Sequence, residues 1–276
     1  MPLTINTNMM ALMAANNLTR SYNALTASVN KLSSGLRINS SADDAAGLAI
    51  RELLRSDIAT LNQGIRNAND AISMLQVMDG AAQVIDEKLI RMRELAEQAA
   101  TGTYSTDQRN IMNQEFQEMK KEIDRIAAAT NFNDIRLLNN SAFSVKIHFG
   151  TGNDPTQDYY YVQGQDLTST GLGIDGVGIS GQHAAQAALG TIYSAIITKD
   201  IARAHFGAMM NRFANTVTNL TIQAENLQAA ESQISDVDVA LEIATFINTQ
   251  IKAQAAVAML AQATQLPSLA LTLLGG

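Results

Sequence analysis

The chain has 276 residues, of which 46% are hydrophobic, 5% aromatic and 16% charged, with no cysteine and a net charge of −7. The absence of cysteine excludes disulfide scaffolds, thiolate catalysis and cysteine-ligated zinc, and the acidic balance argues against nucleic-acid grooves and basic membrane-binding faces. Because its apolar residues are mostly aliphatic, the composition favours long packed helices over a pocketed enzyme core.

The first predicted helix is an N-terminal arm whose apolar residues recur at alternating steps of four and three, as on one face of a helix. This stripe comprises Leu18, Tyr22, Leu25, Val29, Leu32 and Leu36. Arg20 is the only charged side chain among the first thirty residues, whereas a lone surface helix normally carries charges on its outer face. We therefore expect this arm to be buried on more than one side, first against another arm and then against neighbouring chains.

Two bundle helices are predicted next, between residues 46 and 142. Apolar residues from 58 to 99 recur at steps of three and four, the spacing of a coiled-coil seam. Gly102 and the good N-cap residues Ser105, Thr106 and Asp107 indicate a break between the helices. A second stripe follows at Met112, Phe116, Met119, Ile123 and Ile126.

The middle of the chain, residues 143–182, has a different pattern. Residues 143–149 alternate between apolar and polar, which predicts a strand with His148 solvated on its polar face. A loop over residues 150–157 and a return strand over residues 159–162 complete a predicted β-hairpin. We expect irregular structure or short β elements from residue 164 to 181, and helix from about His183.

The last part of the chain carries two more helical stripes. One, between residues 206 and 227, belongs to the bundle. The other forms a C-terminal arm in which Lys252 is the only charge after Glu242. Its stripe comprises Val237, Leu241, Ala244, Ile247, Ile251, Ala255 and Ala258.

These elements predict a mainly α fold, an elongated antiparallel helical bundle or coiled coil with a small β-hairpin region. We expect an inner coiled-coil arm domain of residues 1–45 plus 236–276. A helical bundle domain would consist of residues 46–142 plus 183–235, with residues 143–182 as its hairpin and glycine-rich loop region.

No catalytic, cofactor or metal site is expected. The three histidines lie at no metal-ligand spacing and no H-E-x-x-H motif occurs. Residues 171–176 match the spacing of the dinucleotide-binding motif G-x-G-x-x-G. They lack the buried strand that must precede this motif, so they predict a loop. No apolar run approaches the roughly 20 residues of a membrane span, and residues 1–6 lack the features of a cleavable secretory signal. The chain is therefore expected to be cytosolic or exported without signal cleavage, and not to be an enzyme.

Several sequence blocks closely resemble bacterial flagellin. The N-terminal blocks are KLSSGLRINS at residues 31–40, DDAAGLAI at 43–50, RNANDAIS at 66–73 and RELA at 93–96. The C-terminal blocks are MNRF at 210–213, ISDVD at 234–238 and MLAQA at 259–263. The resemblance covers about residues 1–140 and 190–276, and it indicates a short form without the outer variable domains of larger flagellins.

The resemblance implies a structural subunit that polymerises into the flagellar filament, with arms that become ordered on assembly. It implies export through the flagellar type III channel to an extracellular flagellum. The implied partners are other copies of the chain, an export chaperone, the filament cap and the hook-junction proteins. It also implies recognition by the flagellin-sensing Toll-like receptor of animals, through Arg91, Arg93, Leu95 and Gln98 on the first bundle helix and Glu115 on the second.

Two alternatives remain open at this point. Hook–filament junction proteins share the terminal motifs of flagellin, but their cores usually diverge from the bundle blocks quoted above. A ligand-binding or enzymatic module could lie in residues 143–182, although forty residues without H-E-x-x-H leave little room for a protease.

Overall fold

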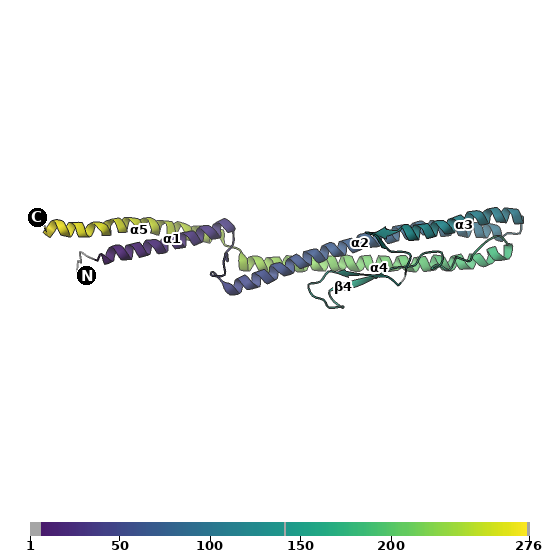
Figure 1. Ribbon diagram of the computed structural model, residues 1–276, viewed down its shortest axis with the longest axis horizontal. Coiled ribbons are helices and arrows are strands. Elements are labelled where there is room, and N and C mark those ends of the chain that lie inside the picture. Colours follow the sequence, from purple (N-terminus) through teal and green to yellow (C-terminus); the bar gives the residue numbers. More distant parts are fainter. Residues whose placement is uncertain (1–6, 141, 275–276) are drawn as a thin grey trace. The chain divides into compact units, whose positions relative to one another are not determined.

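The computed structural model describes residues 7–140 and 142–274, with backbone only for residues 266–274. The fold is mainly α, as expected, and its elements are labelled in Figure 1. The helices are α1 (Met9–Ser34), α2 (Ala45–Ala100), α3 (Thr106–Ala129), α4 (Gln182–Ser235) and α5 (Val239–Leu274). The strands are β1 (Asn131–Phe132), β2 (Ile135–Arg136), β3 (Ser144–His148) and β4 (Tyr159–Gln163).

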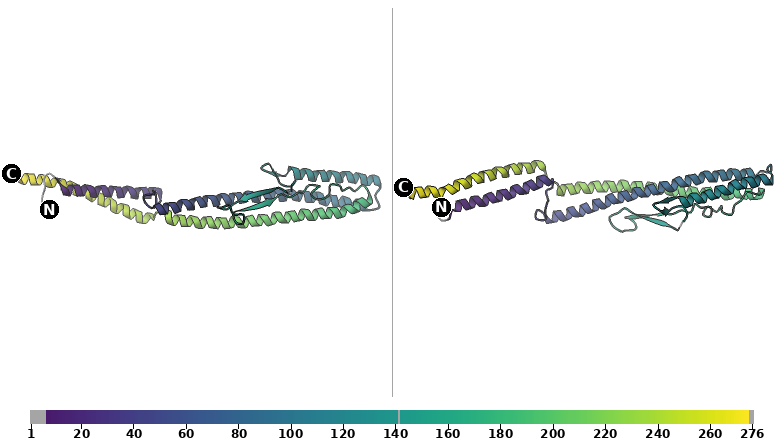
Figure 2. Two further views of the ribbon diagram at one scale, coloured as in Figure 1. Left: turned by 60° about the horizontal axis from the view of Figure 1, so that its bottom comes forward. Right: turned by 45° about the horizontal axis from the view of Figure 1, so that its top comes forward.

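The chain forms two compact units. The arm unit contains the residues up to Ser56 and those from Asn226 onward, and the bundle unit contains Asp57–Glu225. Within the arm unit, α1 and α5 lie side by side (Figures 1 and 2) and run antiparallel. The Asn8 amide at the start of α1 reaches the Ala263 carbonyl oxygen near the end of α5, at 2.7 Å.

Both ends of α1 are capped. The Asn8 side chain accepts a hydrogen bond from the Ala11 N–H at 3.0 Å, as an N-cap residue does. At the other end Gly35 has a φ of 72° and donates its N–H to the Lys31 carbonyl. Because left-handed backbone strains any residue with a Cβ, glycine suits this end. Leu36 therefore lies beyond the helix, whereas the sequence stripe had placed it on the same helical face.

The core of the bundle unit follows the predicted seam of α2. The seam residues that are fully or almost fully buried are Leu61, Ala68, Leu75, Met78, Ala82, Ile85, Leu89, Met92, Ala96 and Ala99. From α3 and α4 the core receives Phe116, Ile123, Phe206 and Phe213. The predicted start of α3 is confirmed, because Ser105 and Gln108 form a reciprocal capping box.

Two antiparallel hairpins follow α3. The β1–β2 pair turns through Asn133 and Asp134, with φ values of 51° and 63°, the left-handed pair that a two-residue type I′ turn requires. In the β3–β4 pair Val145 lies opposite Val162, which confirms the predicted hairpin. The prediction that His148 is solvated is wrong: its side chain is half-buried and its ring stacks on Tyr159, with centroids 6.0 Å apart.

The segment of residues 164–181 contains no helix or strand and is held against α3. The Asp124 carboxylate accepts hydrogen bonds from the Ser169 N–H at 2.7 Å and the Ser169 hydroxyl at 2.8 Å. Further along, Asn113 accepts from the Ile179 N–H and Gln117 donates to the Val177 carbonyl. These side chains fix an otherwise irregular segment over the helix.

Candidate interaction surfaces

The α1 residues predicted for self-assembly divide between two faces. Leu18, Leu25 and Leu32 are half-buried and belong to the side of α1 that packs on α5. Tyr22 and Val29 are 50% and 46% exposed. The small residues of the packed side, which the apolar stripe omitted, are Ala11, Ala14, Ser21 and Ser28.

The α5 residues predicted for self-assembly are mostly on the solvent side. Leu241, Ile247 and Ile251 are 68%, 48% and 57% exposed, and Val237 precedes the helix. The side of α5 that packs on α1 is instead formed by Glu242, Phe246, Thr249, Ala253, Ala256, Leu260 and Ala263. These residues also recur at steps of four and three. Because Glu242 and Thr249 are polar, the pattern of apolar residues alone does not show this repeat.

One side-chain pair joins the two arms across their packed faces. Ser28, which is 4% exposed, donates its hydroxyl to the Glu242 carboxylate at 2.5 Å. The carboxylate is thereby hydrogen-bonded where the helices meet, which offsets part of the cost of removing it from water. The arms therefore combine small apolar contacts with a specific polar contact.

Exposed apolar residues also cover the start of α1. Met9, Met10, Leu12 and Met13 are each between 51% and 54% exposed. Burying a Leu- or Met-sized side chain contributes about 1.5–3 kcal/mol. Contact with another molecule at this surface or at the outer face of α5 would therefore be strongly favoured. Exposed apolar residues that cluster in this way are typical of an interaction site.

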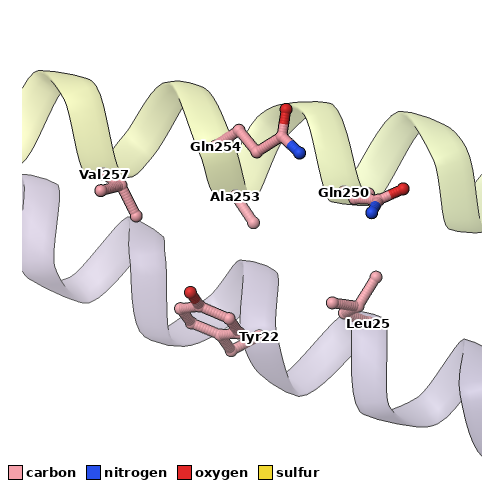
Figure 3. A pocket seen from close by; sticks show the side chains of 6 residues that line it. All are labelled: Tyr22, Leu25, Gln250, Ala253, Gln254 and Val257. Carbon is pink, nitrogen blue, oxygen red and sulfur yellow. The ribbon is translucent and has the colours of Figure 1, made fainter.

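A groove runs between the two arms. Its volume is about 370 Å³, and its lining residues are Tyr22, Leu25, Gln250, Ala253, Gln254 and Val257. Figure 3 shows Leu25 pointing toward α5 and Ala253 pointing back toward α1. None of these side chains carries a charge at neutral pH.

The connections at the base of the arms are held by two arginines. Arg37 donates to the Ile234 carbonyl at 3.2 Å from Nε and 2.7 Å from Nη2, at the C-terminal end of α4. Arg51, only 8% exposed, donates to the Ile38 carbonyl at 2.7 Å. Sequence reasoning did not identify either role, although both residues lie in or beside the flagellin-like blocks.

The residues predicted for receptor contact include an exposed ion pair. Arg91 on α2 donates to Glu115 on α3 at 2.9 Å and to Glu94 at 3.0 Å. The hydrogen bond to Glu115, followed by that to Glu94, raises the pKa of Arg91 above its ordinary value. The Arg91 and Glu115 side chains remain 48% and 41% exposed, so a partner can reach both.

The other predicted receptor residues make different contacts. Leu95 is 2% exposed and belongs to the bundle core. The Arg93 guanidinium lies 5.5 Å from the ring centroid of Tyr193 on α4. Gln98 donates to the Tyr104 hydroxyl at 3.0 Å. Of the five residues, Arg91 and Glu115 are therefore the pair that the structure brings together at the surface.

Residues 7–140 and 142–274 contain no cluster of three or more His, Cys, Asp or Glu side chains suited to a metal ion. Among the described helices, none combines the length and the apolarity needed to cross a membrane.

Comparisons with known proteins identify related sequences over nearly the whole chain. The family models for the bacterial flagellin N-terminal and C-terminal helical regions match residues 5–142 and 189–274. A flagellin of Halalkalibacterium halodurans is 40% identical over 270 residues, covering 98% of this chain and 99% of that protein. Flagellin FlaB2 of Treponema pallidum is 38% identical over 286 residues, again covering 98% and 99%.

Solved structures give the same picture of the fold. The crystal structure of Bacillus cereus flagellin has a TM-score of 0.50 and 32% identity, and the match covers 60% of this chain and 94% of that one. A hook-associated protein of Vibrio parahaemolyticus, described as putative, has a TM-score of 0.59 at 14% identity, with 70% and 100% coverage. At that identity the second match shows a shared fold alone.

Proposed function

Because this chain belongs to the bacterial flagellin family and is therefore a structural subunit of the flagellar filament, we propose that its arms supply the contacts between subunits. The observation that carries this proposal is the outer face of α5, where Leu241, Ile247 and Ile251 are about half exposed or more. No acidic residue follows Glu242, so this face can be buried by another copy without desolvating a carboxylate.

Assembly also provides the free energy that orders the arms. Ordering a residue costs on the order of 1.5 kcal/mol, and the packed sides of α1 and α5 consist largely of alanine, serine and half-buried leucine. Filament contacts would bury the remaining apolar faces and add about 1.5–3 kcal/mol for each large side chain. We therefore propose that residues 1–45 and 236–276 act as an inner arm domain that is stabilised by polymerisation.

Seeded elongation tests the assembly proposal. Purified monomer is mixed with short filaments at neutral pH and moderate salt, and filament length is followed by electron microscopy. Wild-type chain should elongate the seeds, whereas the L241Q/I247Q/I251Q variant should not. As a matched control, the bundle-unit variant I111Q changes an isoleucine that is 67% exposed and should leave elongation in place. Equal elongation by wild type and the triple variant would refute the role of the outer face.

The cellular route is also part of the proposal. The chain would leave the cell through the flagellar type III channel and add to an extracellular filament. Export chaperone, filament cap and hook-junction proteins are the partners that this route requires. Deleting residues 239–274 should abolish filament addition while leaving the bundle unit folded, which circular dichroism and electron microscopy would report together.

Receptor recognition is a second proposed function, favoured by the exposed Arg91–Glu115 pair. Leu95 is withdrawn from the contact surface because its side chain is buried. The test is a reporter assay with cells that carry the flagellin-sensing Toll-like receptor. R91A should signal at least about tenfold more weakly than wild type, which corresponds to a loss of about 1.4 kcal/mol in binding free energy. R125A is the matched control, because Arg125 forms a comparable exposed ion pair with Glu122 on α3. Equal signalling by all three proteins, or by none, would reject the proposal.

A further inference from the structure

The groove between α1 and α5 is neutral, which restricts what can occupy it. Its six lining residues carry no charged side chain, and the basic residues Arg20 and Lys252 are not among them. A charged segment would lose hydration on entering without meeting a counter-ion. The occupant is therefore expected to present uncharged side chains.

The rows of residues that line the groove continue along both arms. Tyr22 and Val29 are seven residues apart on α1, and Ile243, Gln250 and Val257 are spaced by seven on α5. In packed helices a seven-residue spacing keeps side chains on one side of the helix, at intervals of about 10.5 Å. The single methyl group of Ala253 at the floor leaves room for a larger side chain to enter between these rows.

The chain itself carries an uncharged apolar surface with the same repeat. On the outer face of α5, Ala244, Ile251 and Ala258 are spaced by seven, with Ile247 and Leu241 nearby. We propose that the groove receives this outer face from a second copy of the chain, with Ile251 entering beside Ala253 as a knob enters a hole. This pairing rests on the proposed filament function and names the surfaces that meet.

The geometry of the pairing explains why assembly does not stop at a dimer. The groove and the outer face are formed by different residues of one arm unit, so a copy that inserts its outer face keeps its own groove free. Contacts between two different surfaces are heterologous, and where they do not close into a ring they generate an open helical polymer. The groove would thus set the polarity of addition.

Cysteine cross-linking tests the pairing directly, because the chain has no cysteine of its own. The variants V257C and I251C are mixed in equal amounts with excess wild-type monomer, grown from wild-type seeds and oxidised. A disulfide-linked dimer of the two variants is expected, several-fold above the dimers that each variant forms alone. M259C is the matched control for V257C, because Met259 is exposed but does not line the groove.

The outcomes separate this inference from the filament function. If filaments grow but V257C and M259C cross-link equally with I251C, or neither does, the groove pairing is overturned and the subunit function stands. If wild-type monomer fails to elongate seeds, the subunit function itself fails. Should a cysteine variant not enter filaments, the elongation rate of Q254E is compared with that of Q76E, an isosteric change at an exposed position of α2 in the bundle unit. Q254E should slow elongation at least about tenfold, because it brings an unpaired charge into the groove, and equal rates would overturn the pairing.

Discussion

Small side chains decide how closely individual elements of this protein approach one another. At Gly64 on α2 an added Cβ would overlap the backbone carbonyl of Phe149, whereas at Gly80 on the same helix nothing lies within 4 Å of that position. Both are glycines in the interior of one helix, so propensity treats them alike. Only the tertiary contact distinguishes them.

The Gly64→Ala substitution should therefore lower the free energy of unfolding by about 1–3 kcal/mol, as overpacking does. Gly80→Ala should raise it by about 0.5–1 kcal/mol, because alanine is the better helix former and no clash opposes it. Thermal and urea unfolding of the two variants beside wild type measure both changes. Equal midpoints for the variants would contradict the close approach at Gly64.

The turn before α2 contains a titratable contact. The Ser40 N–H and then the Asn39 N–H donate to the Asp43 carboxylate, at 2.9 and 3.1 Å, and they hold the pKa of Asp43 below its ordinary value of 3.8. A lowered folded-state pKa means that the stabilisation is present above the ordinary value and is lost as pH falls through the folded-state pKa. NMR titration should place the Asp43 midpoint below 3.8, with the Ser40 amide shift following it. A midpoint at or above 3.8 would contradict these hydrogen bonds.

At the scale of elements, sequence periodicity predicted the α2 seam and the β3–β4 hairpin because burial on one face dictates both repeats. It missed the β1–β2 pair, whose two-residue strands are too short to alternate. Asn133 and Asp134 between Phe132 and Ile135 were an available signal, since these residue types tolerate left-handed turns. The packed face of α5 was missed for a different reason, because two of its residues are polar. Glu242 is accommodated there by its hydrogen bond with Ser28 and Thr249 by its small size, and a hydrophobicity pattern detects neither property.

The packing of α4 on α2 includes a buried charge that sequence patterns did not identify. The Lys199 ammonium, 1% exposed, pairs with Asp86 on α2 at 2.5 Å and with Asp200 at 2.7 Å. One turn further along α4, Arg203 pairs with Asp79 on α2 at 2.7 Å. The hydrogen bond to Asp79 raises the pKa of Arg203. These contacts fix which turns of the two helices face each other.

Removing Asp86 should cost more than removing both members of its pair. D86N leaves the buried Lys199 charge with less compensation and should destabilise the bundle by roughly 3 kcal/mol. The double variant D86N/K199M should lose less, because no buried charge remains to be compensated. D79N, in a pair that is about one-third exposed, should cost about 1 kcal/mol or less. Urea unfolding measures all three, and an additive double variant would contradict this account.

At the scale of the whole molecule, the low charge content is unevenly distributed. Arg20 is the only charge in the first thirty residues and Lys252 the only one after Glu242, and both segments belong to the arm unit. The sequence therefore predicts that a second copy binds at the arms, but it does not specify which side of each arm the other arm covers. That choice depends on cross-helix contacts such as Ser28–Glu242, which no single helix repeat contains.

Hydrogen exchange should reveal that the arms are less stable than the bundle core in the monomer. In the monomer, amides of α1 and α5 should exchange many-fold faster than those along the α2 seam, because the arms pack on each other through one narrow face while Leu75, Met78 and Leu89 are completely buried. Local opening free energy follows such burial. In filaments the arm amides should become protected to a level near that of the bundle, since neighbouring copies cover their outer faces. The α2 seam, protected in both states, is the internal control for the mass-spectrometric measurement. If the arms are as protected in the monomer as in the filament, assembly-coupled ordering is refuted. If they exchange rapidly in both states, their role in the contacts between subunits is refuted.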